Sequence, residues 1–315
     1  MNQRPVILGV VGDSAAGKTT ITRGLVRVLG EEQVAHICTD DYHRYDRKQR
    51  AELGITPLHP DCNYLDIMGQ DIIHLRCGDP ILKPVYVHHD GTFGPPVYVR
   101  PGSFTVIEGL LGYYLPEMRD MYDVRVYLNP PEELRRHWKV QRDCSRRGYT
   151  TDQVLAELDR REPDSAQFIR PQSRHADMLV SFMPPDGGES DPTHLDAELT
   201  LRAGLPHPDL TAFVQSFDDG LRLLERGGDE VLMIPGRIDP AKAGEIEEAI
   251  WERMHFATHL RARRLGEFTV GTELYRSDSL ALVQLLILYQ LVTAKAAVAL
   301  GGEGSRAAGS VPSGA

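Results

Sequence analysis

The sequence predicts an α/β fold in which a mostly parallel sheet is flanked by helices, extended toward the C-terminus by a smaller α+β region. Two observations support this prediction. Short runs rich in β-branched residues, at 5–11, 104–107 and 124–128, are each followed by glycine or proline turn signals, as buried strands are. Helical patterns follow the first and third runs, and strands that alternate with helices indicate parallel pairing.

The elements follow in chain order. After strand 5–11 and a glycine-rich turn, a helical pattern runs from about 17 to 29, and a second strand is expected to end near Cys38. After strand 124–128, Asn129-Pro130-Pro131 leads into a helix that reaches about 147. Asp239-Pro240 suits an N-cap with proline at the first helical position, and the helix that it opens is expected to end near 264. Strands are also expected at 197–201 and 230–234.

The segment 280–300 is apolar nearly all round but carries Gln284, Gln290 and Lys295. A buried core helix is therefore favoured over a membrane span. The turn-rich stretch 184–192 divides the chain into a domain at 1–183 and an α+β extension at 184–300 packed on it. The glycine- and serine-rich tail 301–315 is expected to be disordered.

Composition narrows the function classes. The 315 residues are 41% hydrophobic and 25% charged, which is typical of a globular protein. A net charge of -10 argues against non-specific binding to nucleic acid or to anionic membranes. The N-terminus does not read as a signal peptide, so a cytoplasmic location is expected. The four widely spaced cysteines favour reduced thiols over disulfides or a structural metal.

The strongest motif fits the pattern GxxxxGK[ST] and lies between a strand and a helix, where a phosphate-binding P-loop belongs. Its glycines let backbone N–H groups surround phosphate oxygens, its lysine reaches the β- and γ-phosphates, and its first threonine can bind Mg²⁺. The first 183 residues are thus predicted to form a P-loop kinase domain. The predicted ATP-binding residues are Gly12, Asp13, Ser14, Ala15, Ala16, Gly17, Lys18, Thr19 and Thr20.

A P-loop does not identify the phosphoryl acceptor, so the next polar cluster matters. Asp40 follows the predicted second strand, and a carboxylate there can accept the proton of an acceptor hydroxyl. His43 and Arg47 can hold a polyhydroxy or anionic acceptor. The alternative is a polar loop in which Asp40 or Asp41 caps the next helix.

Two further features suit phosphoryl transfer. Glu108 ends a predicted strand and resembles the acidic residue that completes a Mg²⁺ site with Thr19, although it can also be an exposed strand end. Helical spacing then places four basic residues on one face, as in a lid that closes over phosphates. The alternative is a solvated basic face, partly paired with Glu132, Glu133 and Asp143. The four residues are Arg135, Lys139, Arg142 and Arg146.

Five segments from about 5 to 180 resemble the phosphoribulokinase family within the uridine-kinase-like group: GDSAAGKTT, ICTDDYHRYDRKQR with GITPLHP, KPVYVHHDG, VIEGLLGYY and WKVQRDCSRRGYTTDQV. The resemblance implies an ATP- and Mg²⁺-dependent kinase that phosphorylates the C1 hydroxyl of ribulose 5-phosphate. It also implies a homodimer. The physiological pathway stays open, whether carbon fixation by the Calvin cycle or another pentose-phosphate route.

Carried over by motif, the resemblance assigns roles to single residues. It implies that Asp40 is the catalytic base and that Lys139 and Arg142 handle ATP and transition-state charge. Glu108 falls on the metal-site acid. Asp143 matches a family acid that supports the metal or orients the lid, or simply pairs with a neighbouring arginine. Contacts to the sugar phosphate fall on His43, Arg47 and Arg147. His88 matches a substrate-binding histidine of a family loop, although it also fits an ordinary surface-loop histidine.

Two departures from the family pattern stand out. Ala16 replaces the P-loop cysteine that partners the Cys38 position in chloroplast and cyanobacterial enzymes, so that disulfide cannot form here. Leu111 stands where the family often has histidine. Two rival functions remain: a uridine- or pantothenate-type kinase, against which the clustered arginines argue, and a nucleotide-binding regulator without turnover.

Overall fold

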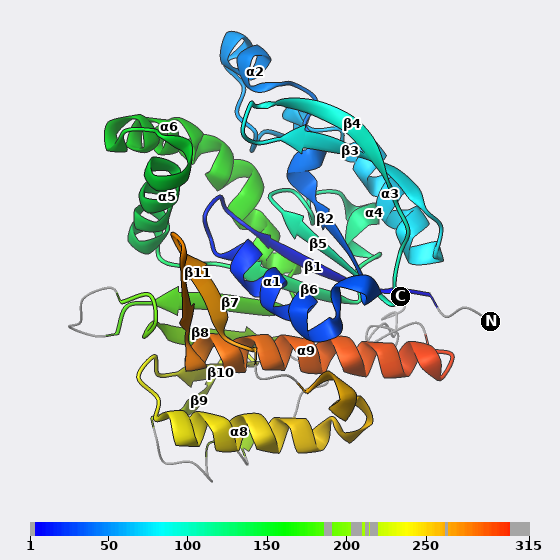
Figure 1. The fold of residues 1–315 in the computed structure, drawn as a ribbon, viewed down its shortest axis with the longest axis vertical. Coiled ribbons are helices and arrows are strands. Elements are labelled where there is room, and N and C mark those ends of the chain that lie inside the picture. The colour runs from blue at the N-terminus through cyan, green and yellow to red at the C-terminus, as the bar shows by residue number, and fades with distance from the viewer. Residues whose placement is uncertain are drawn as a thin grey trace, which may run out of the picture.

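The computed structural model describes residues 4–185, 191–202, 210–211, 214, 220–261 and 264–302. Most of the predicted loop at 184–192 and of the predicted tail at 301–315 lies outside these ranges. Among the described residues, eight strands form one central sheet in the order β2-β5-β1-β6-β7-β8-β10-β9 (Figure 1). Their bounds are β1 (Val6–Gly12), β2 (Val34–Cys38), β5 (Phe104–Gly109), β6 (Val124–Leu128), β7 (Met178–Met183), β8 (Asp196–Leu201), β9 (Arg222–Arg226) and β10 (Asp229–Ile234).

The first five strands of this order run parallel, and the last three are joined antiparallel. The predicted mostly parallel sheet is thus confirmed. The sheet also continues without a break from β7 into β8, across the domain boundary expected from the sequence. The kinase part and the C-terminal extension therefore share one sheet.

Helices cover both faces of the sheet, and two short antiparallel ribbons lie outside it (Figure 1). Along β1, Val6, Leu8 and Val10 face one apolar cluster while Ile7 and Val11 face the other, as strand alternation requires. The ribbons are β3 (Ile81–Val87) with β4 (Thr92–Val99) and β11 (Glu267–Val270) with β12 (Glu273–Arg276). The helices are α1 (Lys18–Leu29), α2 (Arg47–Leu53), α3 (Leu65–Cys77), α4 (Pro116–Arg119), α5 (Glu132–Arg147), α6 (Thr151–Asp164), α8 (Pro240–Arg253) and α9 (Asp278–Ala299).

Most predicted elements are present within one or two residues of their predicted bounds, but the helix after Asp239 is shorter than expected. Asp239 caps α8 by accepting hydrogen bonds from the backbone N–H of Ala241 and Lys242, as predicted. The helix ends at Arg253, not near 264, because Met254 leaves the helical conformation and a 3₁₀ segment, His255–Leu260, follows. The prediction of one long helix was wrong at this end.

The long apolar helix α9 lies in the core. Among the described residues it is the one helix long and apolar enough to cross a membrane, and 72% of its most apolar stretch is buried within the fold. Its Gln284 side chain donates to the Thr20 carbonyl at 3.1 Å and accepts from Gly266 N–H at 2.9 Å. A side chain at Gly24 would collide with Gln284, so glycine permits this close approach. The C-terminal extension thereby supports the helix that begins at the P-loop.

Candidate active site

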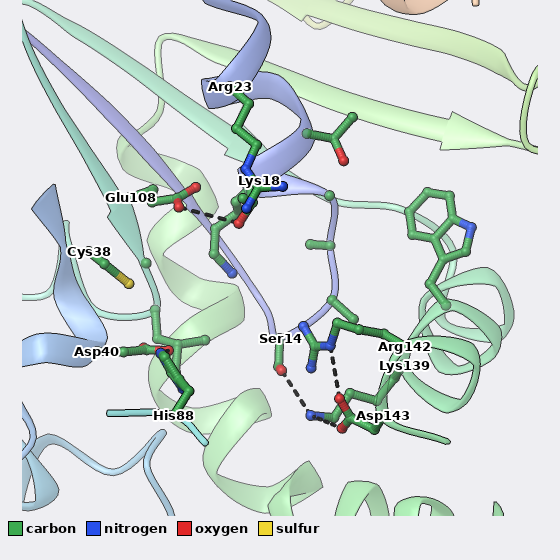
Figure 2. A pocket seen from close by; sticks show the side chains of 18 of the residues that line it. Ser14, Lys18, Arg23, Cys38, Asp40, His88, Glu108, Lys139, Arg142 and Asp143 are labelled. Atoms are coloured by element: carbon green, nitrogen blue, oxygen red, sulfur yellow. Dashed lines mark hydrogen bonds and ion pairs between the residues drawn. The ribbon is translucent and has the colours of Figure 1, made fainter. Parts of the chain in front are cut away.

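A cleft of about 1500 Å³ opens at the carboxyl ends of the parallel strands. The P-loop, the end of β2, α5 and the β11–β12 ribbon all contribute to its walls. Figure 2 shows Cys38, Asp40 and His88 on one wall, Ser14, Lys139 and Arg142 on the facing wall, and Lys18 between them. Ligands of open α/β sheets bind at this end of the strands, where crossing connections leave a crevice. This makes the cleft the candidate active site.

The P-loop has the backbone shape of an anion site. Ala15 and Gly17 both have positive φ, 66° and 93°, and successive turns of this kind direct N–H groups into a concavity. The Lys18 ammonium donates to the carbonyls of Gly12 and Asp13 at 2.9 and 2.8 Å, and burial lowers its pKa despite nearby carboxylates. The Asp13 side chain is turned away and bonds Ser165. Asp13 therefore offers the cleft its backbone rather than its carboxylate.

Asp40 and Asp41 are adjacent but play different parts in the structure. Both lie in the 3₁₀ segment Thr39–Tyr42. Asp41 pairs with the ammonium of Lys83 and accepts from the Tyr86 N–H at 2.9 Å, so it fastens β3 to this segment. Asp40 instead lines the cleft, with its carboxylate 3.8 Å from His88 Nε2.

The Asp40 carboxylate is held in its ionised form. Burial acts to raise its pKa, but attraction to His43, His88, Lys18 and Arg142 outweighs this effect, so the pKa lies below its usual range. An ionised carboxylate within the cleft can accept a proton from a bound hydroxyl. Neither aspartate provides the side-chain cap that was the alternative for them: the N-cap of α2 is Asp46, which accepts from the Gln49 N–H.

His43 is buried and oriented by a residue that the sequence analysis did not single out. Its Nδ1 lies 2.7 Å from Asn63 Oδ1. The Asn63 amide nitrogen donates to the carbonyls of Pro57 and His59, so its oxygen must accept from the imidazole. Burial lowers the pKa of His43, which favours a neutral ring with Nε2 as an acceptor. Such a ring suits a sugar hydroxyl as its partner.

The other predicted acceptor residues gather at the same end of the cleft. The Arg47 guanidinium donates to the His88 carbonyl at 2.6 Å, which ties α2 to the turn after β3. Arg147 is 3.6 Å from Asp143 and, like Arg47 and His88, lines the cleft. Two guanidinium groups beside a histidine form a suitable environment for a phosphate monoester.

Helix α5 brings two of its basic residues, Arg135 and Lys139, against the P-loop. Lys139 is buried, donates to Ser14 Oγ at 3.3 Å and pairs with Asp143 at 2.8 Å. Arg142 pairs with the same Asp143 at 2.9 Å. Arg135 is also buried, but its guanidinium contacts the Ser14 carbonyl and Glu132 and so anchors the helix. The alternative of a solvated basic face does not hold for Arg135 and Lys139, which are buried, but the pairing that it expected with Glu132 and Asp143 is present.

Asp143 accordingly holds the cationic side chains of α5 together. Three of them lie within 3.6 Å of its carboxylate, and their charges lower its pKa to about 2 against the effect of burial. Burial and the neighbouring guanidinium groups of Arg142 and Arg161 lower the pKa of Lys139 to about 7, although Asp143 opposes this change. Lys139 is thus a buried amine beside the P-loop, and its pKa lies near neutral pH.

Glu108 and Thr19 place two oxygen donors side by side. Glu108 ends β5, is buried, and has Oε1 3.3 Å from Thr19 Oγ1. Its other oxygen accepts from Thr22 at 2.9 Å, and His36 lies 3.4 Å away. Burial raises the pKa of Glu108, but contacts with His36, Thr22 and Lys18 lower it overall. An ionised carboxylate next to a hydroxyl matches the oxygen ligands that Mg²⁺ prefers, so these residues fit the ion.

The far end of the cleft includes residues without a predicted role. The Trp138 indole lies against Gly17 of the P-loop, and the ribbon residues 267–271 also border the cleft. An aromatic ring beside a phosphate loop is suited to stack on a nucleoside base. No motif identified this surface, because Trp138 and the ribbon are more than a hundred residues apart.

Of the two departures from the family pattern, Ala16 borders the cleft and Leu111 does not. Ala16 is buried in the core next to α1, and Leu111 is buried close to Asn63 and Asp40. Cys38 lines the cleft, and burial together with the charges of Asp40 and Glu108 raises its pKa well above the usual value. All four cysteines are free.

Comparisons with known proteins agree with this arrangement. The model of the phosphoribulokinase/uridine kinase family matches residues 7–186. A phosphoribulokinase of Synechocystis sp. is 42% identical over 58% of this chain and 54% of that protein. A uridine kinase of Oceanobacillus iheyensis is 31% identical over 60% of this chain and 90% of that protein. A phosphoribulokinase structure from Rhodobacter spheroides has a TM-score of 0.61 and 19% identity, covering 82% of this chain and 100% of that one, which supports the fold. The chain spans about half the length of the curated phosphoribulokinases that it matches.

Proposed function

The chain belongs to the phosphoribulokinase/uridine kinase family, and on this premise we propose that it transfers the γ-phosphoryl group of MgATP to the C1 hydroxyl of ribulose 5-phosphate. The observation that carries the proposal is the composition of one cleft. It joins a P-loop, the ionised Asp40 carboxylate and a pocket lined by Arg47 and Arg147. A neutral acceptor has no need of that pair of guanidinium groups.

In the proposed reaction, Asp40 accepts the proton of the C1 hydroxyl while the hydroxyl oxygen forms a bond to the γ-phosphorus of ATP. The bond between that phosphorus and the β–γ bridging oxygen breaks, and ADP leaves. Lys18, Lys139 and Arg142 offset the negative charge of the transition state, which is the main contribution that a protein makes to phosphoryl transfer. Thr19 and Glu108 would hold Mg²⁺, which when bound offsets charge on the β- and γ-phosphates.

The acceptor subsite contains groups of two kinds. Arg47, Arg147 and His88 would bind the 5-phosphate, and a neutral His43 would accept a hydrogen bond from a sugar hydroxyl. Because Asn63 fixes the His43 ring, the ring is already oriented for this hydrogen bond before the acceptor binds. Pre-organisation of this type reduces the entropy lost on binding.

The acceptor can be tested directly by measuring ADP release with ribulose 5-phosphate, uridine and pantothenate in parallel. We expect turnover with ribulose 5-phosphate and none above background with uridine and pantothenate, neither of which carries a phosphate group. Turnover with uridine alone would agree with a kinase activity but contradict ribulose 5-phosphate as the acceptor. ADP release with none of them, from protein that binds ATP, would favour the regulator alternative.

The pH dependence offers an independent test of Lys139. Its ammonium is present below a pKa of about 7 and is lost as the pH rises through that value, so kcat/KM is expected to fall above pH 7. Bound phosphates attract the ammonium, so the corresponding fall in kcat should occur at higher pH. Lys139→Arg keeps its charge throughout and should abolish this descending limb. A limb that persists unchanged in Lys139→Arg would assign it to another group.

We also propose a homodimer in the cytoplasm, on the family resemblance alone. Light scattering on the purified chain should then give twice the 35.2 kDa chain mass. A mass of one chain at all concentrations would contradict the dimer.

A further inference from the structure

Three possible metal-ligand atoms converge on one wall of the cleft. They come from Cys38 at the end of β2, Asp40 in the following 3₁₀ segment and His88 after β3. A thiol sulfur, a carboxylate oxygen and an imidazole nitrogen there all lie within 4.8 Å of one another. Figure 2 shows the three side chains adjacent on the wall opposite α5. We propose that they form an inhibitory binding site for a thiophilic divalent cation such as Zn²⁺.

The nitrogen and oxygen ligands need little adjustment to bind such an ion. Zn²⁺ bonds nitrogen and oxygen at about 2.0–2.2 Å, so two such ligands in a tetrahedral site lie about 3.4 Å apart. His88 Nε2 and Asp40 Oδ2 are 3.8 Å apart, and a few tenths of an ångström would close the difference. Three protein ligands leave a fourth position for water or a substrate oxygen, as in open zinc sites.

Charges of both signs surround the three ligands, and the donor types separate this site from the Mg²⁺ site. Glu108, the register partner of Cys38 on the next strand, adds a carboxylate nearby. The Lys18 ammonium, which interacts with Asp40, already donates to the carbonyls of Gly12 and Asp13. Thr19 and Glu108 offer only oxygen, which suits Mg²⁺, whereas sulfur and imidazole ligands select Zn²⁺ or Co²⁺.

The consequence for activity rests on the proposed function. An ion bound at this site would occupy the Asp40 carboxylate and prevent it from accepting a proton. It would also fix His88 and the turn after β3 to the sheet, away from the acceptor. The site would therefore switch off turnover without oxidation of any cysteine, and removal of the metal would restore it.

The experiment uses the full chain and Co²⁺ as the probe, because Co²⁺ bonded to a thiolate gives a charge-transfer band in the near ultraviolet. The wild type is expected to show this band at one Co²⁺ per chain, and millimolar Mg²⁺ should not remove it. Cys38→Ala should lose the band, while the exposed Cys77→Ala should keep it as the matched control. Since outer-shell changes alone weaken metal binding 10–100-fold, His88→Ala should lower the Co²⁺ affinity by more than about tenfold.

Activity provides the second readout. Zn²⁺ should lower turnover at least about 100-fold, the scale of losing a general base. EDTA should restore turnover, and a phosphine reductant should not. Cys38→Ala should resist Zn²⁺ while keeping the metal-free rate. No band in the wild type, a band that survives in Cys38→Ala, or an unchanged Co²⁺ affinity in His88→Ala would overturn the site even if the kinase proposal stands. A band without inhibition by Zn²⁺ would overturn the inhibitory role of the site. If the chain turns over no acceptor, the proposed function fails, but the Co²⁺ band still tests whether the metal site exists.

Discussion

Asp40→Asn is expected to lower kcat for ribulose 5-phosphate by roughly 10²–10⁴, the usual contribution of a positioned general base. The amide keeps the size of the side chain but cannot accept the hydroxyl proton. Because Asp40 does not hydrogen-bond the P-loop in the structure, ATP binding should change little. The measurement is kcat from initial rates together with the ATP dissociation constant by calorimetry.

Asp41→Asn is the matched control for this variant. Asp41 is bonded to Lys83 and to the Tyr86 N–H, so its replacement leaves a buried ammonium without its ionised partner. Loss of one partner of a buried ion pair costs about 3–5 kcal/mol in the free energy of unfolding. We therefore expect a lower Tm for Asp41→Asn with most of kcat retained in the folded protein. The opposite result, full activity in Asp40→Asn and loss in Asp41→Asn, would transfer the base to Asp41.

Lys139→Met is expected to lower kcat by roughly 10²–10³, the loss that follows removal of one donor to transition-state charge. The Lys139 ammonium lies 3.3 Å from Ser14 Oγ on the P-loop, where the γ-phosphate would be bound. Methionine fills a similar volume, and Asp143 keeps Arg142 and Arg147 as partners. The fold should therefore remain intact, which circular dichroism would verify.

Arg136→Met on the same helix provides the control. Arg136 pairs with Asp159 of α6 and does not line the cleft, so the same change of charge there should leave kcat within about twofold, in keeping with the small contribution of exposed ion pairs. Equal losses in the two variants would mean that the net charge of α5, rather than the position of Lys139, supports the reaction.

The sequence alone determined the parts of this protein that depend on local pattern. The P-loop, the strands around it, the N-cap at Asp239 and the buried helix α9 each depend on residues close together in the chain. Short-range spacing and turn chemistry therefore predicted them. The strand ends also indicated that Asp40 and Glu108 would approach the P-loop, because parallel strands end at a common edge.

The tertiary structure alone decided which of these residues meet. Asp40 differs from Asp41 because β3, over forty residues later, packs on the 3₁₀ segment and engages only Asp41. Lys139 becomes a buried amine because α5 packs on the P-loop, and no local pattern carries that contact. The approach of His88 to Cys38 and Asp40 likewise depends on where the β3–β4 ribbon lies. Such contacts arise from the packing of distant segments, and one sequence does not encode their geometry in any local spacing.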